Sequence, residues 1–251
     1  MQLDEKWSFV GKKQKHCDEQ DPREHTRGDC WDHVAFDPES RLVLQLLVGK
    51  RSGTRVLHLL KALREQLQGR VPRLITSDNF APYATCIELV FGRPRRPRPS
   101  GQGKKRPAPE SASAQLTYAT VRKHRRQGRV VSVESKVIFG SEASLAGALK
   151  ASECSTAVNT SFIERHNATD RHRNARKGRR TYRFSKDWQV HAAMSCFTNY
   201  SYNFCWPVRT LRRKIGKKRY EKRTPAMAAG LTDHVWPLSE WLAIPVLMHS
   251  G

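Results

Sequence analysis

Three acidic residues stand where their carboxylates could act together, although long stretches of chain separate them. Asp4 lies in a first segment rich in strand formers, Asp78 ends the segment "RLITSD", and Glu164 precedes a run of arginines in "TSFIERHN". Acidic residues are scarce, 23 against 46 basic ones, so their placement is informative. Carboxylates that meet without a cation repel one another, and oxygen ligands favour Mg²⁺ or Mn²⁺. The three residues therefore predict a divalent-metal site.

Such a site has a definite chemistry. Two divalent ions about 4 Å apart can activate a water or hydroxyl group and stabilise the leaving oxygen of a phosphodiester. Glu5 stands beside Asp4, but successive residues of a strand point to opposite faces of the sheet. We therefore expect Asp4, and not Glu5, to enter the site.

The elements that must position these acids form an α/β pattern. A strand is predicted in "LDEKWSFVGKK", and a hairpin in "WDHVAFDPESRLVLQLLVGKRS" with its turn at 37–40. Apolar residues at helical spacing predict a helix over 53–68, and "RLITSDNF" predicts a short buried strand. Another strand or strand pair is predicted in "RVVSVESKVIFG", with helices from about residue 160 and over 185–199. An α/β sheet would gather these strand ends and helix starts in one crevice.

The composition divides the chain into parts. Residues 93–129 are rich in Pro, Gly, Ser and basic residues, which predicts a flexible basic insertion. It interrupts a predicted catalytic domain over 1–186. Residues 187–251 are predicted to form a helical C-terminal extension that packs on the core and includes a basic run at 209–223. The insertion could bind phosphates at any sequence, or be a plain flexible loop.

The net charge indicates the partner. A formal charge of +23 points to a polyanion, either nucleic acid or an anionic membrane. No apolar run approaches the roughly 18 residues of a membrane span, and the start has no stretch typical of a signal peptide. We therefore expect a cytoplasmic protein without a membrane partner. The six cysteines form no CxxC pair and are expected to be reduced. A zinc site from Cys17, Cys30, His16 and His25 would have a spacing that fits no common zinc finger.

Several motifs together resemble a known family. "LDEKW", "TSDNF" and "FIERHN", followed by "RHRNARKGRR" and "FSK", are similar to the catalytic core of bacterial DDE transposases of the insertion sequence one family. The similarity runs from the first strand to about Lys186, apart from the basic insertion. It implies a ribonuclease-H-like mixed sheet flanked by helices, in which Asp4, Asp78 and Glu164 bind two Mg²⁺ or Mn²⁺ ions. His166 and Asn167 match the residues that follow the family's glutamate, and would help position the site or the DNA.

The resemblance also implies partners. The substrate would be double-stranded DNA, both transposon ends and target, which the enzyme cuts and joins as a homo-oligomer. The basic residues after Glu164 are expected to contact the DNA: Arg165, Arg171, Arg173, Arg176, Lys177, Arg179, Arg180 and Lys186. Such transposases usually carry an N-terminal region that recognises the ends, and this chain opens three residues before Asp4. We therefore expect an upstream region or a separate protein to supply end recognition.

Simpler interpretations exist for each acid. Glu164 with Ser161 fits a capping box, in which it would only satisfy backbone donors at a helix start. Asp78 could be a turn residue at a strand end, and Asp4 a solvated residue near the terminus. His166 could be a surface or packing residue.

Other functions also remain open. Trp7 and Trp31 are interpreted as core or sheet-face residues rather than as platforms for stacking bases, and the arginines could be only a solvated face. The whole chain could be a non-catalytic basic DNA-binding protein, a structure-specific nuclease, or a truncated and inactive transposase.

Overall fold

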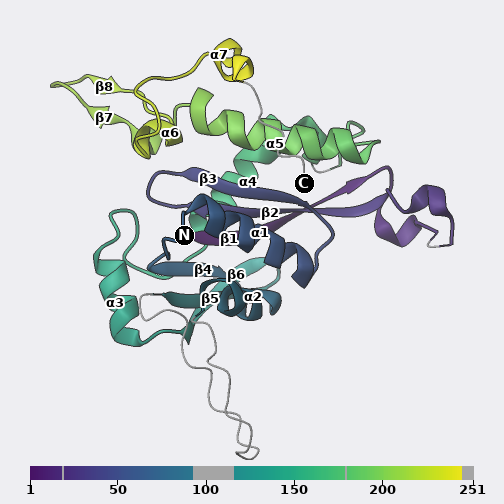
Figure 1. Ribbon diagram of the computed structural model, residues 1–251, viewed down its shortest axis with the longest axis horizontal. Helices are drawn as coiled ribbons and strands as arrows, with labels where there is room; N and C mark the ends of the chain where they lie inside the picture. Colours follow the sequence, from purple (N-terminus) through teal and green to yellow (C-terminus); the bar gives the residue numbers. More distant parts are fainter. Residues whose placement is uncertain (19, 93–115, 179, 245–251) are drawn as a thin grey trace, which may run out of the picture.

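The computed structural model describes residues 1–18, 20–92, 116–178 and 180–244 of the 251-residue chain. Its centre is a mixed six-stranded sheet in the order β3-β2-β1-β4-β5-β6 (Figure 1). Strands β1, β4 and β5 run parallel, while the pairs β1–β2, β2–β3 and β5–β6 are antiparallel. The strands are β1 Gln2–Val10, β2 Gly28–Asp37, β3 Leu42–Gly49, β4 Leu74–Asp78, β5 Thr117–Arg126 and β6 Arg129–Phe139.

Helices flank both faces of this sheet (Figure 1). The α-helices are α1 Gly53–Gln66, α2 Pro82–Phe91, α3 Glu142–Lys150, α4 Ser161–Arg173, α5 Trp188–Cys205, α6 Pro225–Ala228 and α7 Leu238–Ala243. Short 3-10 turns are η1 Gln14–His16, η2 Pro22–Glu24, η3 Ala175–Lys177 and η4 Arg209–Leu211. A small second sheet pairs β7 Arg213–Lys214 with β8 Tyr220–Glu221. None of the helices in the described ranges is long and apolar enough to cross a membrane.

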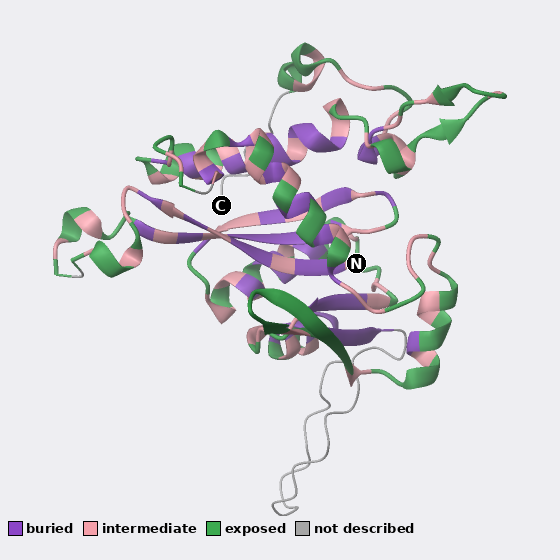
Figure 2. Cartoon of the chain, turned by 180° about the vertical axis from the view of Figure 1, so that it is seen from behind, coloured by how far each residue is buried: buried purple, intermediate pink, exposed green. Residues whose placement is uncertain are grey.

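Two hydrophobic cores hold the layers together. On one face, α1 and α2 bury residues such as Leu59 and Ile87 against Leu3 of β1 and Ile75 of β4. On the other, the core cluster at α4 and α5 consists of Val34, Phe36, Val43, Leu46, Ile163 and Tyr202. Figure 2 shows the central strands largely buried, whereas most of β6 is exposed. Alternate residues of β2 therefore belong to different cores, Ala35 to the first and Val34 and Phe36 to the second, as strand geometry requires.

Helix α5 also covers the outer edge of β3. Asn203 accepts a hydrogen bond from the backbone N–H of Val43 and donates one to its carbonyl, both at 2.9 Å. The Tyr200 hydroxyl accepts a hydrogen bond from the N–H of Leu46 at 3.2 Å. Polar side chains of α5 thus occupy the place of a further strand, which protects an edge that could otherwise pair with another chain.

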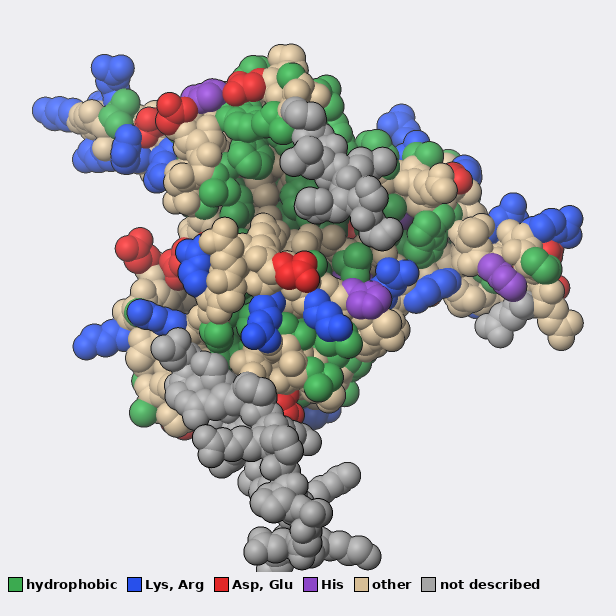
Figure 3. All heavy atoms as spheres, viewed as in Figure 1, with side chains coloured by type: hydrophobic (Ala, Val, Ile, Leu, Met, Phe, Trp, Pro, Cys, Tyr) green, Lys and Arg blue, Asp and Glu red, His purple; other side chains and the backbone are tan. Residues whose placement is uncertain are grey.

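Most elements predicted from the sequence are present. The first strand, the hairpin with its turn at 37–40, the helix after it and the strand ending at Asp78 are confirmed, with α1 ending two residues early. Helices α4 and α5 are also confirmed, although α5 starts at Trp188 and continues to Cys205. Helices α2 and α3 and the β7–β8 pair were not predicted. Lys and Arg side chains gather around that pair (Figure 3).

The predicted extent of the basic insertion is wrong. Residues 93–115 lie outside the described part, but residues 117–126 form β5, which pairs in parallel with β4 near the centre of the sheet. The first half of β5 is buried, whereas its basic second half projects with β6 as a hairpin. Its two-residue turn uses Gln127 and Gly128 with φ of 51° and 77°, a conformation typical of tight hairpins. The basic composition of this region therefore led to an internal strand of the sheet being missed.

Candidate active site

The parallel pairing of β1 with β4 brings two of the predicted acids together. The register pairs Gln2 with Thr76 and Leu3 with Ser77, so Asp4 and Asp78 are the next residues on adjacent strands. Strand β4 ends at Asp78, whereas β1 continues to Val10. The carboxyl end of β4 thus opens a crevice beside β1, the position at which α/β sheets place their ligands.

Glu5 joins the two aspartates in this crevice. One carboxylate oxygen each from Asp4, Glu5 and Asp78 lies within 4.8 Å of the other two. We call these three residues the acid cluster. The prediction that Glu5 stays out of the site is therefore wrong. The reason is that β4 ends at Asp78. Beyond this point no residue of β4 lies beside β1, so side chains from both faces of β1 can reach the open end of β4.

The electrostatics of the acid cluster reflect crowding and burial. Burial, reinforced by the negative charge of Asp78, raises the pKa of Asp4 to about 6 and that of Glu5 to about 7. Burial also raises the pKa of Asp78. The buried Tyr83 hydroxyl lies beside Glu5 and partly lowers its pKa, but Oε1 of Glu5 has no hydrogen bond of normal geometry in the described structure. A divalent cation would satisfy this oxygen and offset the repulsion, so the residues present fit such an ion.

Asp78 has a second role at the strand end. Its Oδ1 accepts a hydrogen bond from the backbone N–H of Phe80 at 3.2 Å, which forms a turn after β4. The interpretation as a turn residue is thus correct but incomplete. Asp4 is half-buried and its pKa is raised, so it is not a freely solvated terminal residue.

Glu164 lies beside the acid cluster without belonging to it. Burial is the main cause of the raised pKa values of Asp4 and Asp78, and the negative charge of Glu164 raises both further. Its Oε1 pairs with the ammonium of Lys123 on β5 and accepts a hydrogen bond from Thr160 Oγ1 at 2.6 Å. The capping box with Ser161 is not formed, because Thr160 is the residue that precedes the helix. The role of Glu164 as a third metal ligand stays a prediction.

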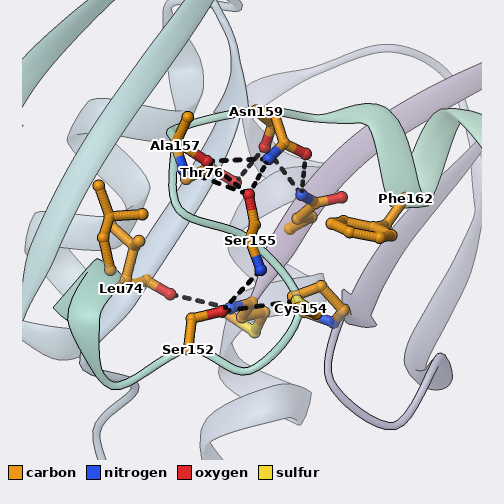
Figure 4. A pocket seen from close by; sticks show the side chains of 12 residues that line it. Leu74, Thr76, Ser152, Cys154, Ser155, Ala157, Asn159 and Phe162 are labelled. Carbon is orange, nitrogen blue, oxygen red and sulfur yellow. Dashed lines mark hydrogen bonds between the residues drawn. The ribbon is translucent and has the colours of Figure 1, made fainter.

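The start of α4 is fixed to the strands that carry the aspartates. Gln2 donates a hydrogen bond to the Asn159 carbonyl at 2.8 Å, and Thr76 donates one to the same oxygen at 3.0 Å. Gln2 also accepts a hydrogen bond from the N–H of Ile163 at 2.9 Å. Figure 4 shows Thr76 and Asn159 meeting at the small pocket beneath this loop. These bonds hold the first turn of α4, and with it Glu164, against the ends of β1 and β4.

His166 and Asn167 point in different directions. Asn167 is buried and its Nδ2 donates a hydrogen bond to Asp4 Oδ2 at 2.7 Å, so it touches the acid cluster as predicted for a positioning residue. His166 is 4% exposed, and its Nε2 lies 2.8 Å from Asn199 Oδ1. Burial lowers its pKa to about 4. The packing interpretation therefore describes His166, and a contact with DNA would require it to leave the core.

The prediction that Lys177 contacts DNA is wrong. Its ammonium is buried between the carboxylates of Asp32 and Asp170, which Lys6 contacts from the other side. We call these four residues the ion cluster. Asp170 on α4 also accepts a hydrogen bond from Thr198 of α5 at 2.9 Å. The ion cluster thus links β1, β2, α4 and α5, and the position of Lys177 in a basic run gave no sign of it.

The other predicted DNA contacts have mixed surroundings. Arg165, Arg180 and Lys186 are exposed, and Arg171 and Arg176 are partly exposed. The guanidinium of Arg173 stacks on Trp206 at 4.0 Å and on Tyr202 at 5.0 Å, measured to the ring centroids. Arg179 lies outside the described residues. Six of the eight predicted contacts therefore reach the surface at least in part: Arg165, Arg171, Arg173, Arg176, Arg180 and Lys186.

Arg51 is a functional candidate that the sequence did not reveal. Its Nη2 lies 3.3 Å from Glu5 Oε2 and 3.9 Å from Asp78 Oδ2. The guanidinium stacks on Trp31 and Phe80, with 5.0 and 4.0 Å to the ring centroids. A cation is thus held at the mouth of the acid cluster by two aromatic rings. The loop after β3 carries no motif that would have identified it.

The proposed zinc site is not formed. In the described ranges, the only group of His, Cys, Asp and Glu side chains that could hold a metal is the acid cluster. Cys30 is buried, and the Cys17 thiol donates a hydrogen bond to the Lys13 carbonyl.

Comparison of the sequence with protein-family models and with curated proteins gave no match.

Proposed function

We propose that this protein is the catalytic part of a metal-dependent transposase that cuts DNA and joins the cut end to a target. The observation that carries the proposal is the acid cluster, where three carboxylates with raised pKa values meet at the carboxyl end of β4. Glu164 stands beside it at the start of α4. The strand order and directions are compatible with a ribonuclease-H-like fold, which we take as part of the proposal.

The roles within the site follow from the contacts. The acid cluster (Asp4, Glu5 and Asp78) together with Glu164 would hold two Mg²⁺ or Mn²⁺ ions, which would activate the attacking water or 3′-hydroxyl and stabilise the leaving oxygen. Asn167 orients the Asp4 carboxylate through its hydrogen bond. Gln2 and Thr76 hold the loop from which α4 starts, so they fix the distance between Glu164 and the strands.

The charge of the chain supports DNA as the substrate. The formal charge of +23 attracts a polyanion, and exposed basic residues follow Glu164 on α4 and in the segment after it. We propose double-stranded DNA as substrate, a homo-oligomer as the active form, and a separate region or protein that recognises the ends.

Cleavage of duplex DNA that carries the flanks of the coding sequence tests the proposal. The full chain should cut it in Mg²⁺ or Mn²⁺ and not in EDTA, and the cut strand should join to a second duplex. Asp4→Asn, Asp78→Asn and Glu164→Gln should each abolish both products. Glu142→Gln is the matched control, because Glu142 is also an acid in the first turn of a helix but lies on exposed α3. Equal products from the wild type and Asp4→Asn would refute the enzyme.

A non-catalytic DNA-binding protein is the second candidate, and a specific observation favours it. The acids of the site already have cationic partners within the chain, since Lys123 pairs with Glu164, and Arg51 with Glu5 and Asp78. This candidate predicts salt-sensitive DNA binding without metal-dependent strand breaks. The same cleavage assay separates the two.

A further inference from the structure

A row of aromatic side chains extends along the sheet from the acid cluster. Trp7 and Phe9 follow Glu5 at alternate positions of β1, so they lie on the same face of the sheet. Trp31 on β2 stands directly opposite Trp7 in the register, and the ring of Phe184 lies 4.9 Å from that of Phe9. All four are half-buried. We call Trp7, Phe9, Trp31 and Phe184 the aromatic row.

Helices α1 and α2 cover the neighbouring part of the sheet, but they leave the aromatic row only partly buried. Leu3, two positions before Glu5 on the same face, is fully buried under α1 and α2. The half-buried rings beyond Glu5 belong to neither of the two core clusters. Instead, the segment at Ser185 runs alongside β1, because Gly11 donates a hydrogen bond to the Ser185 carbonyl at 2.7 Å. That contact holds Phe184 in line with Phe9.

Three cations stand over the aromatic row. The Lys13 ammonium lies 6.0 Å from the Trp7 ring centroid, the Lys186 ammonium 2.9 Å from that of Phe184, and the Arg51 guanidinium 5.0 Å from that of Trp31. Lys13 and Lys186 are exposed, and neither has a carboxylate of the described residues within ion-pair distance. Arg51 joins the row to the acid cluster through Glu5.

Alternating rings and cations suit a ligand with planar bases and phosphates. Bases stack on aromatic side chains while the cations pair with the backbone, and every base has a face that can stack. In a duplex the base faces are buried in the helix, so only an unpaired strand can use the rings. A partner protein with an apolar surface would gain nothing from three cations placed over the rings.

We propose that the aromatic row and its three cations bind an unpaired DNA strand and lead it to the acid cluster. From the proposed function, the proposal takes only that DNA is the ligand. A strand lying on the row passes Trp7 and Trp31 before it reaches Arg51. Arg51 then meets a phosphate next to the carboxylates, so it contacts the bound strand where the row ends.

Binding in EDTA tests the proposal without any cleavage. We would measure the fluorescence anisotropy of a labelled oligothymidylate and of a duplex of equal length with the full chain. Trp7→Ala and Phe184→Ala should each weaken oligothymidylate binding about fivefold or more, the effect of losing one stacked base. Duplex binding should change less than twofold. Trp7→Phe keeps an aromatic ring, preserves packing and should retain most of the affinity.

Two controls make the result specific. Trp206→Ala removes another half-exposed tryptophan that is stacked on an arginine, Arg173, away from the row, and should leave oligothymidylate binding unchanged. Lys13→Ala combined with Lys186→Ala keeps every ring and should weaken oligothymidylate binding and reduce its salt dependence. Equal losses for both DNA forms, or none in Trp7→Ala and the lysine pair, would overturn the proposal. Unchanged DNA affinity with lost self-association would assign the row to contacts between chains.

The outcome is separable from that of the proposed function. Glu142→Gln, at an exposed acid on α3, should bind oligothymidylate as the wild type does. If the wild type cuts no DNA while Trp7→Ala loses oligothymidylate affinity, the proposed enzyme fails and the strand-binding row stands. If the wild type cuts DNA in Mg²⁺ and all row variants bind both DNA forms normally, the row fails and the enzyme stands.

Discussion

Asn167 on α4 donates a hydrogen bond of 2.7 Å from its Nδ2 to Oδ2 of Asp4 on β1, across 163 positions of sequence. The other oxygen of Asp4 accepts the backbone N–H of Glu5 at 2.9 Å. Both oxygens of this carboxylate therefore have a fixed donor, and α4 is tied to β1 at the acid cluster. Burial still outweighs these bonds, since the pKa of Asp4 is raised to about 6.

Removal of the Asn167 amide should disturb the site and leave the fold intact. The hydrogen bond from Asn167 favours the ionised carboxylate, so Asn167→Ala should raise the pKa of Asp4 further. Metal-dependent cleavage should fall about 10- to 100-fold, and the acid limb of its pH profile should move to higher pH. Asn203→Ala, which breaks bonds to β3, is the control: it should lower the melting temperature without moving the pH profile.

The fold was largely predictable where local pattern decides structure. Apolar residues at helical spacing predict helix α1, and the turn residues at 37–40 predict the β2–β3 hairpin. Strand β5 was not predictable, because its buried first half is short and is followed by basic residues that are typical of loops. Its place beside β4 depends on a parallel pairing that no local pattern encodes.

The candidate site was predictable only as far as single residues at strand ends. Asp4 and Asp78 meet because they sit at equivalent positions of adjacent parallel strands. Glu5 was excluded because successive side chains of a strand point to opposite faces. This alternation holds along β1, but it does not keep Glu5 away from Asp78 at the end of the neighbouring strand β4. The roles of Arg51 and Lys177 depend on contacts with distant segments of the chain. Their basic character alone did not indicate which carboxylate each one contacts.

Replacement of Glu5 should change how stability depends on pH. The pKa of Glu5 is 4.5 in the unfolded chain and about 7 in the folded protein, so the unfolded chain loses the proton at lower pH. The free energy of unfolding of the wild type therefore falls as the pH increases from 4.5 to about 7. Glu5→Gln avoids this cost, at most about 3 kcal/mol at about 1.4 kcal/mol per unit. His166 and His191, whose pKa values are lowered to about 4, have the opposite effect in both proteins and cancel.

Urea unfolding in EDTA measures this difference. The unfolding free energy of Glu5→Gln minus that of the wild type should increase between pH 5 and pH 8. A difference that stays constant across that range would show that the folded protein holds Glu5 ionised throughout.

The ion cluster should make Lys177 structural and leave it without a role in DNA binding. Lys177→Met leaves Asp32 and Asp170 with Lys6 alone, which should reduce the unfolding free energy by about 3–5 kcal/mol. At a temperature where the variant is folded, its DNA affinity should equal that of the wild type. Arg180→Met in the same exposed segment should do the reverse, with a stability change within about 0.5 kcal/mol and weaker DNA binding. Weaker binding by folded Lys177→Met would contradict its burial.

The ion pair between Lys123 and Glu164 should weaken the binding of metal ions at the site. The Lys123 ammonium neutralises the carboxylate that the proposed mechanism assigns to a metal ion, so it competes with that ion. Lys123→Met should therefore lower the Mg²⁺ concentration for half-maximal cleavage severalfold, whereas Glu164→Gln should abolish cleavage. Lys136→Met, on the exposed adjacent strand, removes the same charge without touching Glu164 and should leave the Mg²⁺ requirement unchanged. A higher Mg²⁺ requirement in Lys123→Met would mean that Lys123 positions Glu164 for the ion instead of competing with it.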